Sequence, residues 1–249
     1  MGKLTGKRAI VTGGASGIGE AIVRLFASEG SDIGILDLSE AAAAALAAEL
    51  VQAHGVKAVS AGADVSQEAA IMAAIGRIEA ANGPTDILVN CAGIDNTVLL
   101  EDMSVAVWDL MIAVHMRGTF LAIRTVLPGM KARKWGRIIN FSSQLAHKGG
   151  ATMVHYCAAK AGIMGLTRAL AHEVGAYGIT VNCINPGPID TPLLRQIPQE
   201  WLDTKLQELP IKRFGKTSEV APTALLLASE EGAYYLGASM NMNGGDYML

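Results

Sequence analysis

The stretch HYCAAK places Tyr156 four residues before Lys160, so on a helix the two side chains share one face. A phenol has an ordinary pKa of about 10 and carries protons poorly at neutral pH. A nearby ammonium favours the phenolate and lowers that pKa, which would let the tyrosine move a proton during catalysis. The alternative is a solvated lysine beside a half-buried tyrosine, so other parts of the chain must decide between the two.

The stretch TGGASGIG, residues 12–19, has the glycine spacing of a loop that binds the phosphates of a dinucleotide. Gly13 permits the tight turn, Gly17 lets backbone amides approach a diphosphate, and Gly19 lets the following helix pack on the preceding strand. The N-terminus of that helix then faces the anion. Because the loop lies between a predicted strand at 8–13 and a predicted helix at 18–30, the pattern predicts a dinucleotide site.

Asp37 closes the second predicted strand, 18 residues past Gly19. A carboxylate at that place accepts hydrogen bonds from an adenosine ribose and repels a 2′-phosphate. A protein that binds NADP needs a cation to pair with that phosphate, whereas the neighbours here are Leu38, Ser39 and, in the glycine loop, Ser16. The residue therefore predicts NAD rather than NADP, and the alternative is a cap at the end of the strand.

The composition fits one large globular domain and excludes several other classes of protein. The chain has 249 residues, of which 51% are hydrophobic and 17% charged, so it is not a disordered protein. A net charge of −3 gives no basic surface for nucleic acid. No uninterrupted apolar run approaches the eighteen or so residues that span a bilayer, and the stretch MGKLTGKRAIVTGG has no signal-peptide h-region, so neither a membrane span nor a signal peptide is expected. Three cysteines form no disulfide framework, which favours the reducing cytoplasm.

Apolar runs of strand length alternate with longer helical stretches along the whole chain, and no linker divides it. This alternation predicts a single α/β domain over residues 1–249, with a doubly wound parallel sheet of Rossmann type and helices on both faces. Ligands in such sheets bind beyond the carboxyl ends of the strands. The predicted strands are 8–13, 32–37, 56–65, 86–90, 135–143, 178–187 and 237–245, and one predicted helix, 39–55, has Ser39 as its N-cap and Gly55 as its C-cap.

The segment 188–217 is the least regular part of the chain and is rich in proline. Long excursions from a compact domain are frequently lids over a binding site. We therefore predict a substrate lid at about 188–217, with a short helix around residues 199–208.

Taken together, these stretches resemble the short-chain dehydrogenase/reductases, and the resemblance covers essentially the whole chain. The motifs, in family order, are TGGASGIG, the acidic residue after the second strand, AGADV, LVNCAG, the serine of INFSS, YCAAK and NPGPIDT. The resemblance implies an oxidoreductase in which hydride transfer belongs to a nicotinamide cofactor and the protein handles the proton. Tyr156 is then the general base in oxidation and the general acid in reduction. Lys160 binds the nicotinamide ribose and lowers the tyrosine pKa, and Ser143 bonds the substrate oxygen, with Ser142 as the alternative.

The resemblance also implies a cofactor site and a substrate site. Asp64 and Val65 would hold the adenine ring, and Thr191 would reach the nicotinamide carboxamide. The implied cofactor-binding residues are Gly13, Ser16, Gly17, Ile18, Gly19, Asp37, Leu38, Asp64, Val65, Asn90, Ala92, Gly93, Tyr156, Lys160, Pro186, Gly187, Ile189 and Thr191. The implied substrate contacts are Ser143, Leu145, Tyr156 and Leu193.

One position departs from the family pattern, because AVHMRGTF has His115 where the family usually has an asparagine. That asparagine holds a water that links the lysine to solvent. A neutral imidazole also has one donor and one acceptor, so His115 could hold the water or carry the proton itself near neutral pH. The alternative is a buried core histidine and a weaker relay. The remaining histidines have no ligands at metal spacing, so no metal is expected.

The expected activity is NAD-dependent hydride transfer between a secondary alcohol and a ketone, as in an alcohol dehydrogenase or carbonyl reductase. Asp37 argues for NAD, and the predicted pocket is apolar. The alternative within the family is a 3-oxoacyl-ACP reductase, an activity that usually draws on NADPH. A remoter alternative is a non-catalytic nucleotide-binding protein, against which the presence of Ser143, Tyr156 and Lys160 argues. By resemblance, the chain is expected to form a homotetramer.

Overall fold

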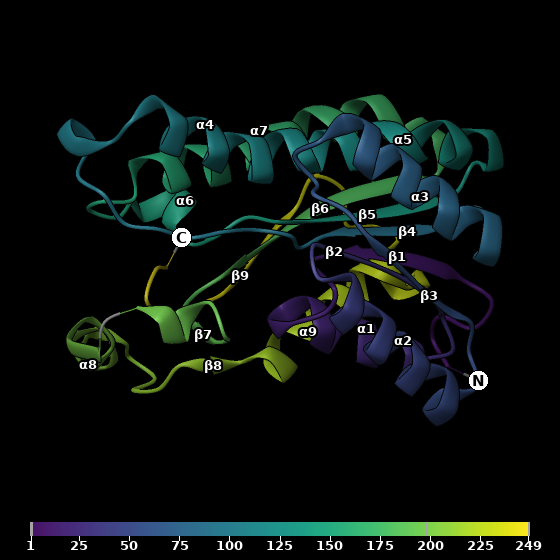
Figure 1. Ribbon diagram of the computed structural model, residues 1–249, viewed down its shortest axis with the longest axis horizontal. Coiled ribbons are helices and arrows are strands. Elements are labelled where there is room, and N and C mark those ends of the chain that lie inside the picture. Colours follow the sequence, from purple (N-terminus) through teal and green to yellow (C-terminus); the bar gives the residue numbers. More distant parts are fainter. Residues whose placement is uncertain (1, 198, 249) are drawn as a thin grey trace.

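A seven-stranded parallel sheet runs through the middle of the computed structural model, which describes residues 2–197 and 199–248 (Figure 1). The strands lie in the order β3-β2-β1-β4-β5-β6-β9. Their bounds are β1 Arg8–Thr12, β2 Asp32–Asp37, β3 Ala58–Gly62, β4 Ile87–Asn90, β5 Gly136–Phe141, β6 Ile179–Pro186 and β9 Ser239–Met242. The predicted doubly wound Rossmann-type sheet is confirmed.

The central strands are buried on both faces and rich in apolar residues, as expected in the middle of a covered sheet. Every residue of β4, β5 and β6 is buried. The strand order reverses at β1, because β2 pairs with one edge of β1 and β4 with the other. Thr12 is in register with Asn90, and Asn90 with Asn140, so these strands end at the same edge. In such sheets, ligands bind in the crevice at that edge.

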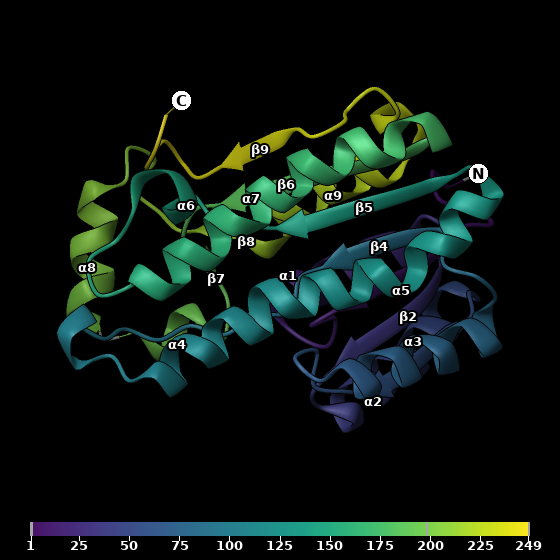
Figure 2. The ribbon, with the colours of Figure 1, turned by 90° about the horizontal axis from the view of Figure 1, so that it is seen from above.

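Two layers of helices cover the sheet, one on each face (Figures 1 and 2). The first layer contains α1 (Gly17–Ser28), α2 (Glu40–His54) and α9 (Thr217–Ala228), and the second contains α3 (Glu68–Asn82), α5 (Gly118–Arg133) and α7 (Val154–Val174). Each layer closes its own apolar core against the sheet. Phe26 and Leu50 lie in the first core, and Ile75 and Met130 lie in the second.

One long helical run lies in the second layer and changes its winding in the middle. It begins as α4 (Val105–Ile112), passes through the π-helical turn η2 (Ala113–Arg117) and continues as α5. By length and composition alone the run could cross a membrane, but half of its most apolar window is buried inside the molecule, as in a core helix. Short π-helical turns inside helices occur frequently at functional sites, and His115 lies in this one.

The segment predicted as a lid lies near the carboxyl ends of the strands (Figure 1). Residues 188–217 form β7 (Ile189–Asp190), the turn η4 (Leu194–Gln196), α8 (Gln199–Glu208) and β8 (Gly215–Lys216), with β7 paired to β8. Figure 1 shows α8 and α6 (Leu145–Lys148) at the same end of the molecule. The short helix predicted at 199–208 is therefore α8, and the lid function of the segment stays a prediction.

Candidate active site

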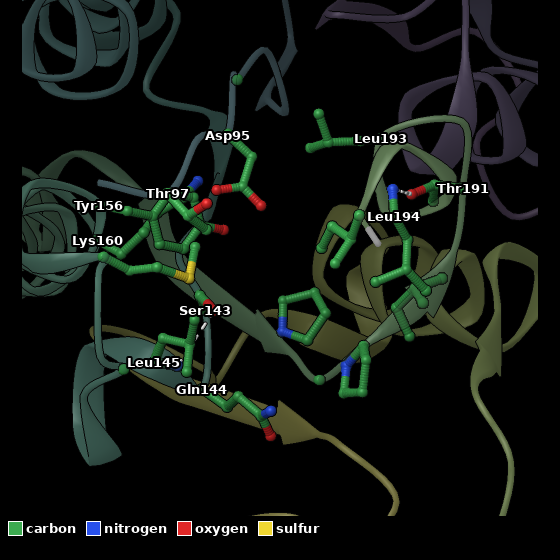
Figure 3. Close-up of a pocket in the computed structure, with 18 of the residues that line it drawn as sticks. Asp95, Thr97, Ser143, Gln144, Leu145, Tyr156, Lys160, Thr191, Leu193 and Leu194 are labelled. Atoms are coloured by element: carbon green, nitrogen blue, oxygen red, sulfur yellow. Dashed lines mark hydrogen bonds between the residues drawn. The ribbon is translucent and has the colours of Figure 1, made fainter. Parts of the chain in front are cut away.

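A pocket of about 550 Å³ opens at the carboxyl edge of the sheet, with mainly apolar walls. Figure 3 shows Tyr156 and Ser143 on one wall and Thr191 and Leu193 across from them. The pocket brings together many of the predicted site residues: Ile18, Gly93, His115, Ser143, Leu145, Tyr156, Lys160, Pro186, Gly187, Ile189, Thr191 and Leu193.

Tyr156 and Lys160 both lie on α7, but their electrostatics differ from the expectation. Lys160 Nζ lies 5.5 Å from the centroid of the tyrosine ring and donates to the carbonyl oxygen of Phe141 at 2.9 Å. Burial lowers the pKa of Lys160 to about 8. Burial and the Asp95 carboxylate raise the pKa of Tyr156, while Ser143 acts in the opposite direction. In this structure the pKa of Tyr156 is therefore raised and not lowered, Tyr156 holds its proton at neutral pH, and the expected influence of Lys160 on it stays a prediction.

The two neighbouring serines after β5 have different partners. Ser142 Oγ donates to the carbonyl oxygen of Lys160 at 2.7 Å and so fastens the end of β5 to α7. Ser143 Oγ accepts the N–H of Leu145 at 3.1 Å. Because that bond occupies a lone pair and not the proton, the Ser143 hydroxyl can donate to a ligand in the pocket. The geometry favours Ser143 over Ser142 for the catalytic role.

The glycine loop is packed too closely for side chains at two positions. Gly13 has φ +64°, and a Cβ there would lie 2.7 Å from Cα of Ala92. A Cβ on Gly19 would lie 2.0 Å from the carbonyl oxygen of Gly13, which is the close approach of helix to strand that the motif predicts. Thr12, which the sequence analysis did not identify, accepts the N–H groups of Cys91 and Ala92 at 3.1 and 3.2 Å. It thereby joins the turn after β4 to the end of β1.

The Asp37 carboxylate accepts hydrogen bonds both from the glycine loop and from the backbone just after its own strand. Its Oδ2 accepts the N–H of Ala15 at 3.0 Å, and its Oδ1 accepts the N–H of Ser39 at 3.0 Å. A carboxylate has further lone pairs, so the same oxygens can still accept from a ribose hydroxyl. Leu38 and Ser16 beside it are exposed. Asp37 therefore caps the strand end, which does not conflict with the ribose contact, and that contact stays a prediction.

Three of the predicted cofactor-binding residues, Asn90 in the cleft and Asp64 and Val65 at the adenine ring, have side chains that are engaged within the protein. Asn90 Nδ2 donates to Asn140 Oδ1 at 2.8 Å, and Asn140 Nδ2 donates to Thr167 Oγ1 at 2.9 Å, so Asn90 links β4 and β5 to α7. Val65 is buried in the core of the second layer. Asp64 accepts a backbone N–H two residues further on, at 2.8 Å. The side chains of Asn90 and Val65 therefore point into the protein, so these residues could contact a cofactor only through their backbone, and their cofactor-binding role stays a prediction.

His115 is buried between the loop after β4 and the tyrosine. Its Nε2 lies 2.8 Å from the carbonyl oxygen and 3.2 Å from the nitrogen of Ile94, and its ring stands edge-on to Tyr156, with the centroids 5.5 Å apart. Gly93 makes room for it, since a Cβ there would lie 2.5 Å from the imidazole Cε1. Burial, and then the charge of Lys160, lowers the pKa of His115 well below its usual value. The expectation that His115 itself carries the proton near neutral pH is therefore wrong.

The water-holding role of His115 stays a prediction, supported by its Nδ1, which is buried without a hydrogen-bond partner among the described residues. We expect His115→Asn to retain activity and to shift the pH–rate profile, because the amide also offers a donor and an acceptor. His115→Ala should lose roughly tenfold in kcat, since it removes the hydrogen-bonding group altogether. The measurement is kcat against pH for both variants. An alanine variant with unchanged rate and pH profile would rule out the relay role.

The wall of the pocket near α8 holds a charged cluster that the sequence analysis did not find. Asp246 is almost fully buried and accepts from Lys205 Nζ on α8 at 2.7 Å and from Lys148 Nζ on α6 at 3.0 Å. Gln144 also donates to it. The cluster joins α6, α8 and the C-terminal segment around the pocket. In the described part of the chain, no group of three His, Cys, Asp or Glu side chains could hold a metal ion.

The predicted dinucleotide loop, a protonated tyrosine and a buried lysine lie at the same edge of the sheet. This combination defines a nicotinamide-dependent oxidoreductase of the Rossmann type. A family model described as "Enoyl-(Acyl carrier protein) reductase" matches residues 13–246. The chain belongs to the short-chain dehydrogenase/reductase family.

Individual relatives match nearly the whole chain. It is 38% identical to the 3-oxoacyl-[acyl-carrier-protein] reductase FabG of Pseudomonas aeruginosa over 245 residues, which cover 98% of this chain and 99% of that one. It is also 38% identical to the (2S)-[(R)-hydroxy(phenyl)methyl]succinyl-CoA dehydrogenase subunit BbsD of Thauera aromatica over 237 residues, 95% of each chain. The crystal structure of a 3-oxoacyl-[acyl-carrier protein] reductase from Brucella melitensis matches with a TM-score of 0.94 and 34% identity, covering 99% of this chain and 93% of that one.

Proposed function

We propose that this protein transfers hydride between a nicotinamide cofactor and C3 of a 3-oxoacyl or 3-hydroxyacyl thioester. The observation that carries the proposal is the position of Tyr156 and Ser143 on the wall of an open, mainly apolar pocket of about 550 Å³, which offers room for an acyl chain. The P. aeruginosa and T. aromatica relatives support it, since both are named for thioester substrates. The predicted activity on a simple secondary alcohol has less support than this alternative.

Reduction at this site needs a proton for the carbonyl oxygen and donors that stabilise the charge developing on it. Tyr156 supplies the proton, since a phenol is protonated at neutral pH and burial raises its pKa further. The Ser143 hydroxyl donates a hydrogen bond to the same oxygen. Lys160, held by the carbonyl of Phe141, keeps a positive charge beside them when it is protonated. The nicotinamide, when bound, supplies the hydride for reduction and accepts it in oxidation.

The test of this function is a spectrophotometric assay of acetoacetyl thioester and butan-2-one with NADH or NADPH, run beside simple secondary alcohols with NAD⁺ or NADP⁺. We expect turnover of the thioester, and its loss in Tyr156→Phe. Turnover of simple alcohols with no turnover of any thioester would overturn the proposed substrate and restore the simple alcohol dehydrogenase. Binding of NADH without turnover of any compound would instead favour a non-catalytic nucleotide-binding protein.

We further propose NADH as the preferred reductant, on the ground of Asp37 and its uncharged neighbours Leu38, Ser39 and Ser16. We expect Asp37→Ser to lower the ratio of kcat/KM with NADH to kcat/KM with NADPH by roughly 10- to 100-fold, because it removes a negative charge next to the 2′-phosphate. Loss of the hydrogen bonds that Asp37 accepts from the backbone of Ala15 and Ser39 affects both cofactors and cancels in the ratio.

The matched control is Asp32→Asn, which changes a carboxylate at the opposite end of the same strand and should leave the cofactor ratio unchanged. A wild type that prefers NADPH, or an Asp37→Ser variant with the wild-type ratio, would show that Asp37 does not select the cofactor.

A further inference from the structure

Asp95 is a carboxylate in the active-site pocket that the hydride-transfer chemistry above does not use. It lies in the loop after β4, and Figure 3 shows its carboxylate directed toward Tyr156. Its Oδ1 is buried and has no hydrogen-bond partner among the described residues. Leaving a buried acceptor without a partner is costly, so a ligand that brings a donor to this oxygen gains the hydrogen bond and relieves that cost.

The loop that carries Asp95 is fastened on both sides of it. On one side, His115 Nε2 contacts the backbone of Ile94 at 2.8 and 3.2 Å. On the other side, His155 Nε2 donates to Asn96 Oδ1. Both histidines are buried, and burial lowers the pKa of each, so they act as neutral clamps and not as cations that would neutralise the carboxylate. Contacts on both sides of Asp95 therefore fix its backbone, and with it the position of the residue at the pocket.

The groups that face the carboxylate leave its oxygen available for a ligand. Lys160 is close enough for its charge to lower the pKa of Asp95, but the Lys160 ammonium donates to the carbonyl of Phe141 instead of to Asp95. Burial has the larger effect and raises the Asp95 pKa to about 6, so the group is ionised at pH 7.5. The Asp95 carboxylate is directed toward Tyr156 (Figure 3), and its charge raises the pKa of Tyr156.

When the reacting oxygen of a substrate is hydrogen-bonded to Tyr156, the carbon next to the reacting carbon therefore lies near the negative charge of Asp95. An ionised carboxylate only accepts hydrogen bonds, so it attracts a hydroxyl or ammonium group and repels a carbonyl or carboxylate oxygen. Leu193 and Leu194 make part of the pocket wall apolar, and the hydroxyl of Thr97 lies on the same side of the pocket as Asp95 (Figure 3).

We propose that Asp95 is a specificity-determining residue that accepts a hydrogen bond from a hydroxyl on the carbon next to the reacting carbon. This inference rests on the proposed hydride transfer at Tyr156 and narrows its substrate. In a 3-oxoacyl or 3-hydroxyacyl thioester the hydroxyl stands on C2 or C4. Among small ketones, an α-hydroxy ketone is preferred over the plain ketone of the same length.

The test compares 3-hydroxybutan-2-one with butan-2-one as reductive substrates, with the proton donor and cofactor unchanged. For the wild type we expect kcat/KM to be roughly 10- to 100-fold higher for the hydroxy ketone, the range expected for a hydrogen bond to a charged group. In Asp95→Ala and Asp95→Leu, the pocket no longer carries this charge. The ratio of kcat/KM for the hydroxy ketone to kcat/KM for butan-2-one should then fall to within roughly twofold of 1. Asp102→Ala, an exposed carboxylate on the turn η1 (Leu100–Asp102), is the control and should keep the wild-type ratio.

The same pair of ketones is also titrated into the NADH-loaded protein, and binding is followed by NADH fluorescence. If no ketone or thioester is turned over, the proposed function fails, and the ratio of the two dissociation constants still tests Asp95. A wild-type ratio near one, or a preference for the hydroxy ketone that persists in both Asp95 variants, overturns the inference. Unchanged melting temperatures show that the variants are folded.

Discussion

Tyr156→Phe is expected to lower kcat by on the order of 10²- to 10⁴-fold, the usual contribution of a general acid. The substitution removes only the hydroxyl, so the ring still packs edge-on against His115. The affinity for NADH should therefore change little. The measurement combines kcat for thioester reduction with NADH binding followed by fluorescence.

The control is Tyr177→Phe, which removes a hydroxyl from an exposed tyrosine on the turn η3 (Gly175–Tyr177), outside the pocket. It should leave kcat unchanged. A Tyr156→Phe variant that keeps a tenth or more of the wild-type rate would show that another group supplies the proton, since the expected loss is roughly 100-fold or larger.

Gly19→Ala is expected to weaken NADH binding by on the order of 100-fold, because strain of up to about 3 kcal/mol follows from forcing an atom into packed backbone. The new Cβ would lie 2.0 Å from the carbonyl oxygen of Gly13, and no side-chain rotation relieves a contact with backbone. The glycine loop must shift away from its helix. Isothermal titration with NADH and a thermal melt measure the two consequences, weaker binding and lower stability.

Gly76→Ala is the matched control, because a Cβ at this position in α3 meets nothing within 4 Å. Alanine in a helix interior is more favourable than glycine by roughly 0.5–1 kcal/mol, so this variant should melt higher and bind NADH as the wild type does. If Gly19→Ala bound NADH normally, the loop would not be the nucleotide site.

Local patterns predicted most of the fold because they report directly on local structure. The helix expected at 39–55 is α2, where Ser39 accepts the N–H of Ala42 at 3.4 Å and Gly55 takes φ +67° as the C-cap. Continuous apolar runs predicted the buried strands, and the strand-loop-helix position of the glycines predicted the tight packing at Gly19. The lid, the homotetramer and the cytoplasmic location stay predictions.

The sequence predicted the parts of the site in which the residues lie on the same helix or strand. It did not predict the parts that depend on contacts between distant segments of the chain. Tyr156 and Lys160 share α7, as their spacing indicates. The inward direction of Asn90 could not be predicted, because its partner Asn140 lies 50 positions away. The raised pKa of Tyr156 depends on burial and on Asp95, and neither is visible in the spacing of YCAAK.

The buried cluster around Asp246 also bears on the order in which the chain folds. Asp246 contacts Lys148 and Lys205, which lie 98 and 41 positions earlier, whereas the glycine loop belongs to the first strand and helix. Contacts that close long loops carry a larger entropic cost and form more slowly than local ones. We therefore expect the nucleotide side of the pocket to assemble early during synthesis, and the substrate side to close only when nearly the whole chain has emerged.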